Sequence, residues 1–136
     1  YIKKEWKRAH YDQAYTRAYE TTLRPTQSGI KIESVMAVVA DSVQRIMDIN
    51  ASWQIDTDGR IITEFRVRRN REFPSLPRFG IRLFLKPDFN QVNYYGMGPE
   101  ESYQDKCRAS SHGLYRAQIS ELHEPYIRPQ ENGSHT

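Results

Sequence analysis

The sequence has little of what membrane, disulfide-stabilised or metal-stabilised proteins need. Its longest apolar run, Val35 to Ala40, is far shorter than the roughly 20 residues that span a bilayer, so we expect no membrane segment. The single cysteine, Cys107, cannot form an internal disulfide, which is consistent with a cytoplasmic protein. The spacings among Cys107 and the four histidines match no short-range pair of zinc ligands, and we expect no metal site.

Motifs of nucleophilic catalysis and of targeting are also missing. The chain has no Gly-x-Ser-x-Gly elbow, and the basic neighbours of Cys107 include no turn that would present a thiolate, so we expect Cys107 in a strand or at a strand end. The chain starts at Tyr1 without an initiator methionine or an apolar signal-peptide core, and it stops just after a turn signal at Asn132-Gly133. We therefore expect a piece of a longer protein, with exposed strand edges that favour self-association.

The charge balance is nearly even. Twenty basic and 17 acidic residues give a net charge of +3, an excess too small to indicate nucleic-acid binding by itself. The run from Arg66 to Arg71 is the best candidate for phosphate contacts, because Phe65 and Phe73 flank its guanidinium groups. Arg66 and Arg68, however, fall on the polar face of an alternating segment, where charges normally face solvent. Nucleic-acid binding stays an alternative on this sequence.

Apolar and polar residues alternate with the period of a β-strand over most of the chain. Residues 2–11 instead have roughly helical spacing and predict one or two turns of helix. Thr57-Asp58-Gly59 is a strong hairpin signal, and Pro74 and Pro77 predict an irregular bridge over residues 70–77. The predicted strands cover residues 15–23, 30–38, 47–56, 61–68, 80–85, 91–95 and 113–120.

Seven or eight short strands separated by turn signals are typical of an all-β, antiparallel β-sandwich. The length of 136 residues and the 38% hydrophobic content are enough for one modest core, so we expect a single domain over residues 1–136. The strand over residues 47–56 should bury one face and expose the other, because its apolar residues strictly alternate with polar ones.

Two segments rich in glycine, proline, tyrosine and glutamate, residues 94–103 and 124–133, are the most distinctive part of the chain. A glycosidase needs two carboxyl groups about 5 to 9.5 Å apart, one of them protonated, and Glu100 and Glu131 are the candidates for such a pair. A carboxylate beside a Gly/Pro turn more commonly accepts hydrogen bonds from backbone amides or tyrosine hydroxyls, and we favour that structural role. The 9 tyrosines and 2 tryptophans also leave open a sugar-binding platform.

These two segments, with Leu76-Pro-Arg-Phe-Gly-Ile81 and Trp6-Lys-Arg-Ala-His-Tyr11, resemble the last domain of the large cytosolic β-galactosidases of glycoside hydrolase family 2. The resemblance covers nearly the whole chain. It implies the first half of a galactose-mutarotase-like supersandwich with a short N-terminal helix, in a multidomain and commonly tetrameric enzyme. It also implies that the catalytic glutamates lie on a TIM barrel outside this chain, and that Mg and Na ions are bound elsewhere in the parent.

The resemblance therefore predicts a chain that is inactive alone, with other domains of the parent β-galactosidase as partners and galactosides such as lactose as substrates of the full enzyme only. A carbohydrate-binding module that uses exposed aromatics is the alternative function. Twelve residues are expected to shape and fix the two loops without a catalytic role: Gly96, Gly98, Pro99, Glu100, Tyr103, Asp105, Pro125, Tyr126, Pro129, Gln130, Glu131 and Gly133.

Overall fold

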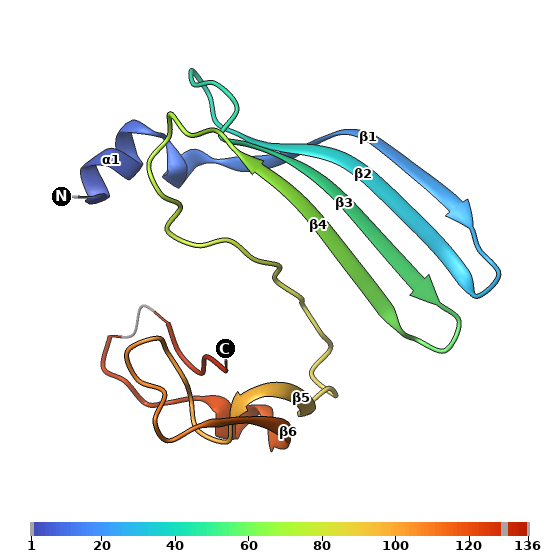
Figure 1. Cartoon of the computed structure of the whole chain (residues 1–136), viewed down its shortest axis with the longest axis vertical. Coiled ribbons are helices and arrows are strands. Elements are labelled where there is room, and N and C mark those ends of the chain that lie inside the picture. The colour runs from blue at the N-terminus through green and yellow to red at the C-terminus, as the bar shows by residue number, and fades with distance from the viewer. Residues whose placement is uncertain (1, 129–130, 136) are drawn as a thin grey trace. The chain divides into compact units, whose positions relative to one another are not determined.

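The computed structural model describes residues 2–128 and 131–135, which form two compact units, Tyr1–Gly80 and Ile81–Thr136. The first unit contains a short helix and four strands, and the second contains two strands (Figure 1). The elements in chain order are α1 (Ile2–Arg8), the 3-10 turn η1 (Tyr11–Gln13), β1 (Tyr15–Pro25), β2 (Gly29–Val39), β3 (Met47–Asp56), β4 (Ile61–Arg69), β5 (Gln91–Gly98), β6 (Ser111–Gln118) and the 3-10 turn η2 (Ile119–Leu122).

The first unit is built on an antiparallel sheet whose strands follow the chain order β1-β2-β3-β4 (Figure 1). The predicted hairpin between β3 and β4 is present. The Asp56 N–H donates to the Arg60 carbonyl at 2.9 Å, and Gly59 occupies the left-handed region at φ 87° that this turn requires. Strand β1 covers its whole predicted range and extends to Pro25, and its pairing with β2 has a register shift between Ala18 and Glu20.

The core of this unit lies on one face of β3, as the alternation predicted. Met47, Ile49 and Ala51 are buried there, and Trp53 packs beside them with its ring edge-on to Phe65 at 5.5 Å between centroids. Asp48 and Asn50, which alternate with Met47, Ile49 and Ala51, are more exposed, whereas Asp56 at the end of the strand is also buried. The period-two pattern therefore identified the buried face correctly over Met47 to Ala51, but not at Asp56, which was predicted on the exposed face.

The irregular segment after β4 was also predicted, and side chains of the first unit fix its backbone. The Trp6 indole N–H donates to the Ser75 carbonyl at 2.8 Å, and the Tyr11 hydroxyl donates to the Pro74 carbonyl at 2.7 Å. The Arg69 guanidinium donates to the carbonyls of Phe73 and Pro74 at 2.7 and 2.8 Å. A segment without a sheet ladder thus finds partners for its carbonyl groups in side chains.

The second unit is organised around the antiparallel pair β5–β6. Tyr94 faces Tyr115 across this pair, with ring centroids 5.5 Å apart. The end of the chain runs back beside β5, because the Met97 N–H donates to the His135 carbonyl at 3.2 Å and the Ser102 N–H donates to the Ser134 carbonyl at 2.6 Å. The described C-terminal residues are therefore part of this unit.

Two predictions of secondary structure were wrong, the strand over residues 80–85 and the strand position of Cys107. Residues 80–85 form no strand: they have no ladder partner among the described residues, and Leu83 and Phe84 are 77% and 85% exposed. Alternation alone does not make a strand, because the ladder also needs a neighbour. Cys107 is an exposed loop residue between β5 and β6 and not part of a strand.

The described residues contain six strands in place of the seven or eight expected, and β6 spans residues 111–118 instead of 113–120. The all-β class, the antiparallel pairing and the single short N-terminal helix agree with the predicted β-sandwich class. No helix in the described part of the chain is long and apolar enough to cross a membrane.

Candidate functional site

Gly96 and Gly98, which were predicted in the first loop, lie in the last part of β5, and they let backbone and side chains approach more closely than a side chain at these positions would permit. A Cβ atom at Gly96 would lie 2.7 Å from the His135 carbonyl oxygen. A Cβ atom at Gly98 would lie 2.7 Å from both the Tyr115 ring and the Tyr94 hydroxyl, and the Gly98–Pro99 peptide bond is cis. These two glycines are needed for close approach and not for a positive φ angle.

Glu101 joins the two predicted loops. Its side chain is buried and accepts hydrogen bonds from Lys106 Nζ at 2.6 Å, from the Tyr126 hydroxyl, and from the Gly133 N–H at 3.3 Å. Lys106 Nζ also donates to the Tyr126 hydroxyl oxygen at 2.7 Å, which closes a three-membered polar cluster. The Glu101 carboxylate therefore links the end of the first loop and Lys106 to Tyr126 and Gly133 of the second loop.

The charges in this cluster stabilise one another. Hydrogen bonds from Lys106 and then Tyr126 hold the pKa of the Glu101 carboxyl below its ordinary value of 4.5. The same bonds raise the pKa of the Lys106 ammonium group, with the bond to Glu101 as the largest cause. Both groups are thus charged in the folded protein near neutral pH, and the pair acts as a fixed ionic link.

Hydrogen bonds between Glu124 and Asn132 join the two ends of the second loop. Gly133 has φ 65°, and a Cβ atom there would lie 2.3 Å from the Leu122 carbonyl oxygen. The Glu124 N–H donates to Asn132 Oδ1 at 2.9 Å, and the Asn132 amide nitrogen donates back to the Glu124 carbonyl. His135 Nδ1 donates to the Met97 carbonyl at 2.9 Å, so the described end of the segment is fixed to β5.

The other predicted loop residues are less closely involved. Glu100 has an exposed side chain, and its carbonyl accepts the Ser110 hydroxyl at 2.8 Å. Tyr103 exchanges two backbone hydrogen bonds with Lys106, and burial raises the pKa of its hydroxyl. Asp105, Pro125 and Glu131 are exposed, whereas Pro129 and Gln130 lie outside the described residues.

Glu101 is the residue that sequence reasoning missed, because the candidate list contained its neighbour Glu100. Nothing in the dipeptide Glu100-Glu101 distinguishes the two side chains. The only relevant signal is the position of Glu101 immediately before Ser102, which is 1% exposed and pairs with the returning chain at His135. The burial of Ser102 and its pairing with His135 are known only from the structure, so the sequence alone does not distinguish Glu101 from Glu100.

The carboxyl groups whose pKa is shifted in the described residues are all shifted in one direction. A general acid needs a raised pKa, whereas the resolved shifts of carboxyl groups, at Glu33, Asp48, Asp56 and Glu101, are all downward. Asp56 shows the largest of these, to about 2, because Gln54, Ser28 and Arg60 donate hydrogen bonds to it. The described residues also contain no group of three or more His, Cys, Asp or Glu side chains that could hold a metal ion.

The arginine-rich segment of β4 has protein partners for most of its guanidinium groups. Arg66 pairs with Glu64 at 2.8 Å, and Arg68 pairs with Asp48 at 2.9 Å. Arg69 is occupied by the carbonyls of the following loop. These contacts are those of a solvated sheet face and give no specific support to phosphate binding.

The beta galactosidase small chain family model matches residues 1–136 of this chain. Beta-galactosidase of Actinobacillus pleuropneumoniae is 40% identical over 134 residues, which cover 98% of this chain and 13% of that protein. The beta-galactosidases of Staphylococcus xylosus and Vibrio cholerae are 33% and 37% identical and cover 98% and 82% of this chain, but only 14% and 11% of their own lengths.

The chain thus spans about an eighth of the length of the relatives it matches. The family model, in contrast, covers the chain from its first residue to its last, and it includes both glycine-rich loops and the cluster around Glu101. This chain belongs to the beta galactosidase small chain family.

Proposed function

We propose that this chain is a non-catalytic β-sheet domain of a β-galactosidase whose complete protein hydrolyses terminal non-reducing β-D-galactosides such as lactose. Membership of the beta galactosidase small chain family supports the parent activity. The observation that carries the non-catalytic role is Glu101. This carboxyl group is the most buried acid of the two loops, and three donors hold it in its ionised form.

A carboxylate in this setting is a poor catalyst for glycoside hydrolysis. As a general acid it would need to hold a proton near neutral pH, and its lowered pKa opposes that. As a nucleophile it would need a free lone pair directed at the sugar, whereas its oxygens accept bonds from Lys106, Tyr126 and Gly133. The geometry suits a structural link between loops.

The role that we propose for the link is to give the loops a fixed shape for contacts with other domains of the parent. Loops held by charged hydrogen bonds lose little conformational freedom on docking, so the entropic cost of assembly is low. We also propose, on the basis of the resemblance, that the parent is a cytoplasmic homo-oligomer whose Mg and Na ions bind outside this chain.

The first test measures turnover of a chromogenic β-galactoside by the purified chain. We expect none above the level of a preparation from cells that lack the gene. Turnover that co-purifies with the chain through a second column would contradict the proposal.

A matched pair of variants in the parent enzyme tests the role of the link, since Glu100 and Glu101 are adjacent glutamates and only Glu101 is buried. We expect Glu101→Gln to lower the melting temperature and to leave kcat within about threefold, and Glu100→Gln to change neither. A fall in kcat of about 10² to 10⁴ at an unchanged melting temperature is the signature of a lost catalytic carboxyl group and would refute the assignment.

A further inference from the structure

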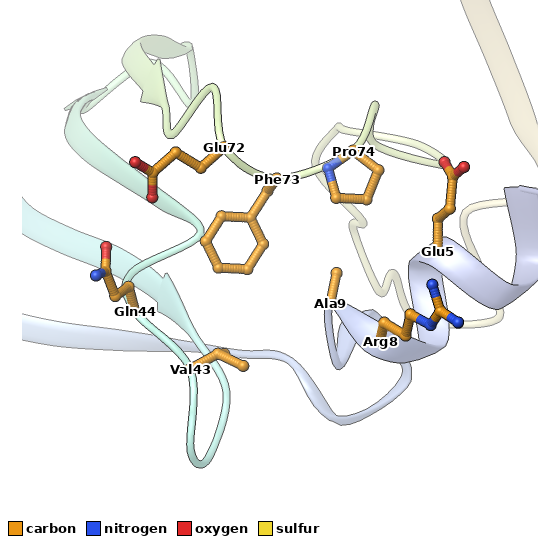
Figure 2. A pocket seen from close by; sticks show the side chains of 8 residues that line it. All are labelled: Glu5, Arg8, Ala9, Val43, Gln44, Glu72, Phe73 and Pro74. Carbon is orange, nitrogen blue, oxygen red and sulfur yellow. The ribbon is translucent and has the colours of Figure 1, made fainter.

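The first unit carries an open hollow of about 620 Å³, which is separate from the cluster around Glu101 in the second unit (Figure 2). Three separate segments form it: the helix α1 with the residue that follows it, the loop between β2 and β3, and the segment after β4. The lining residues are Glu5, Arg8, Ala9, Val43, Gln44, Glu72, Phe73 and Pro74.

The lining separates into an apolar centre and two polar ends (Figure 2). The Phe73 ring and the side chain of Val43 point into the middle of the hollow, with Pro74 and the buried Ala9 beside them. Glu72 and Gln44 lie at one end, and Glu5 and Arg8 lie at the other. A ligand in this hollow would meet an apolar surface flanked on both sides by hydrogen-bonding groups.

Hydrogen bonds and a ring contact hold the wall that carries Phe73. Its carbonyl groups receive hydrogen bonds from Trp6, Tyr11 and Arg69, at distances of 2.7 to 2.8 Å. The Tyr11 ring also stacks on the Phe73 ring, with an angle of 15° between the planes and 6.4 Å between the centroids. A pre-formed wall lowers the conformational entropy that a ligand must remove on binding.

The polar groups at both ends are available to a ligand. Within the described part of the chain, the side chains of Glu5, Arg8 and Glu72 take part in none of the ion pairs, which involve other residues. All three side chains are on exposed residues. They supply four carboxylate oxygens as acceptors and one guanidinium as a donor, and the Gln44 amide adds a donor and an acceptor.

We propose that this hollow binds a neutral glycoside, with an apolar C–H face of the sugar on the Phe73 ring and hydroxyl groups on the polar ends. Hydroxyl groups both donate and accept, so they can use the carboxylates of Glu5 and Glu72 together with the donors of Arg8 and Gln44. Arg8 lies beside Glu5 and offsets that carboxylate, which leaves Glu72 as the lining carboxylate that a cation would meet without a neighbouring guanidinium, whereas a glycoside uses both polar ends. A purely apolar partner would bury these charges without compensation. The site goes beyond the structural role proposed above and requires no catalysis.

Amide chemical shifts of the ¹⁵N-labelled chain test the proposal during titration with methyl β-D-galactoside and, separately, with n-butylammonium chloride. We expect the galactoside to shift the amides of Ala9, Gln44 and Phe73 with a Kd of about 1 to 10 mM, and the ammonium ion to shift none of them. Glu72→Gln should weaken binding about threefold and Phe73→Ala at least tenfold, while Glu100→Gln on the second unit should leave it unchanged.

Three results would overturn the proposal. They are the absence of shifts up to about 50 mM galactoside, shifts that map to other residues, and shifts produced only by the ammonium ion, which would assign the hollow to a basic partner. Glu72→Gln keeps the test decisive if Phe73→Ala does not fold, because the Glu72 side chain makes no contact that supports the fold. The turnover assay reads a different property, so failure of one proposal is distinguishable from failure of the other.

Discussion

Substitution of Gly133 by alanine should be among the most damaging single-methyl changes in the second unit. The residue has φ 65°, and the left-handed conformation costs a residue with a Cβ atom about 1 to 2 kcal/mol. The new methyl group would also lie 2.3 Å from the Leu122 carbonyl oxygen, so the backbone must move, at a further cost of about 1 to 3 kcal/mol. Together these effects predict a destabilisation of about 2 to 5 kcal/mol.

Gly59 is the matched control. It also has a positive φ angle, 87°, but a Cβ atom there would have no neighbour within 4 Å. Gly59→Ala therefore carries the conformational cost of about 1 to 2 kcal/mol without the steric one. The difference between the two variants isolates the contact with Leu122.

Native-state hydrogen exchange resolves the two effects because each amide reports on its own unit. In Gly133→Ala the Met97 and Ser102 amides, whose acceptors are the carbonyls of His135 and Ser134, should exchange at least about 30-fold faster, since about 1.4 kcal/mol corresponds to a factor of ten. The Asp56 amide in Gly59→Ala should accelerate by about 5- to 30-fold. Equal acceleration in the two variants would show that the contact with Leu122 does not constrain the chain.

Two further predictions concern the first unit. Because the pKa of Asp56 is lowered, its contribution to stability is present above its ordinary pKa of 3.8 and is lost as the pH falls towards about 2. The urea midpoint of the wild type should therefore drop over this range more than that of Asp56→Asn. Identical pH profiles of the two proteins would contradict this prediction. Ile49 is 6% exposed in the core, so Ile49→Val should lower the free energy of unfolding in urea by about 0.5 to 1.5 kcal/mol and Ile49→Ala by about 2 to 5 kcal/mol. Asn50→Ala on the other face should change it by no more than about 0.5 kcal/mol. A similar loss of stability at both positions would place the core elsewhere.

The first unit was largely predictable because local signals and the fold agree there. The alternation from Met47 to Ala51 identified the buried face, and Thr57-Asp58-Gly59 located the hairpin, since both depend on residues close in sequence. The bridge after β4 was predicted from Pro74 and Pro77. Its hydrogen bonds to Trp6 and Tyr11 were not, because more than 60 residues separate the partners along the chain.

The second unit was harder to predict because its structure depends on non-local contacts. The stretch from Gly80 to Leu85 has the alternation of a strand, but a strand also needs a neighbour, and no described residue pairs with it. The motif around the two loops was recognised, yet the residue that connects them was misplaced by one position. Whether Glu100 or Glu101 turns inward is decided by where the chain returns at Gly133, which no local pattern encodes.

The hydrogen bonds that join α1 to the segment after β4 have one more consequence. No residue of α1, which is described in full, is buried, and a helix of seven residues is not stable in isolation. Its position must therefore come from directional contacts such as the bond from Trp6 to Ser75. Because α1 supplies Glu5 and Arg8 to the hollow and the segment to which it is bonded supplies Phe73, a ligand that binds the hollow more tightly with α1 in place would also stabilise the position of the helix.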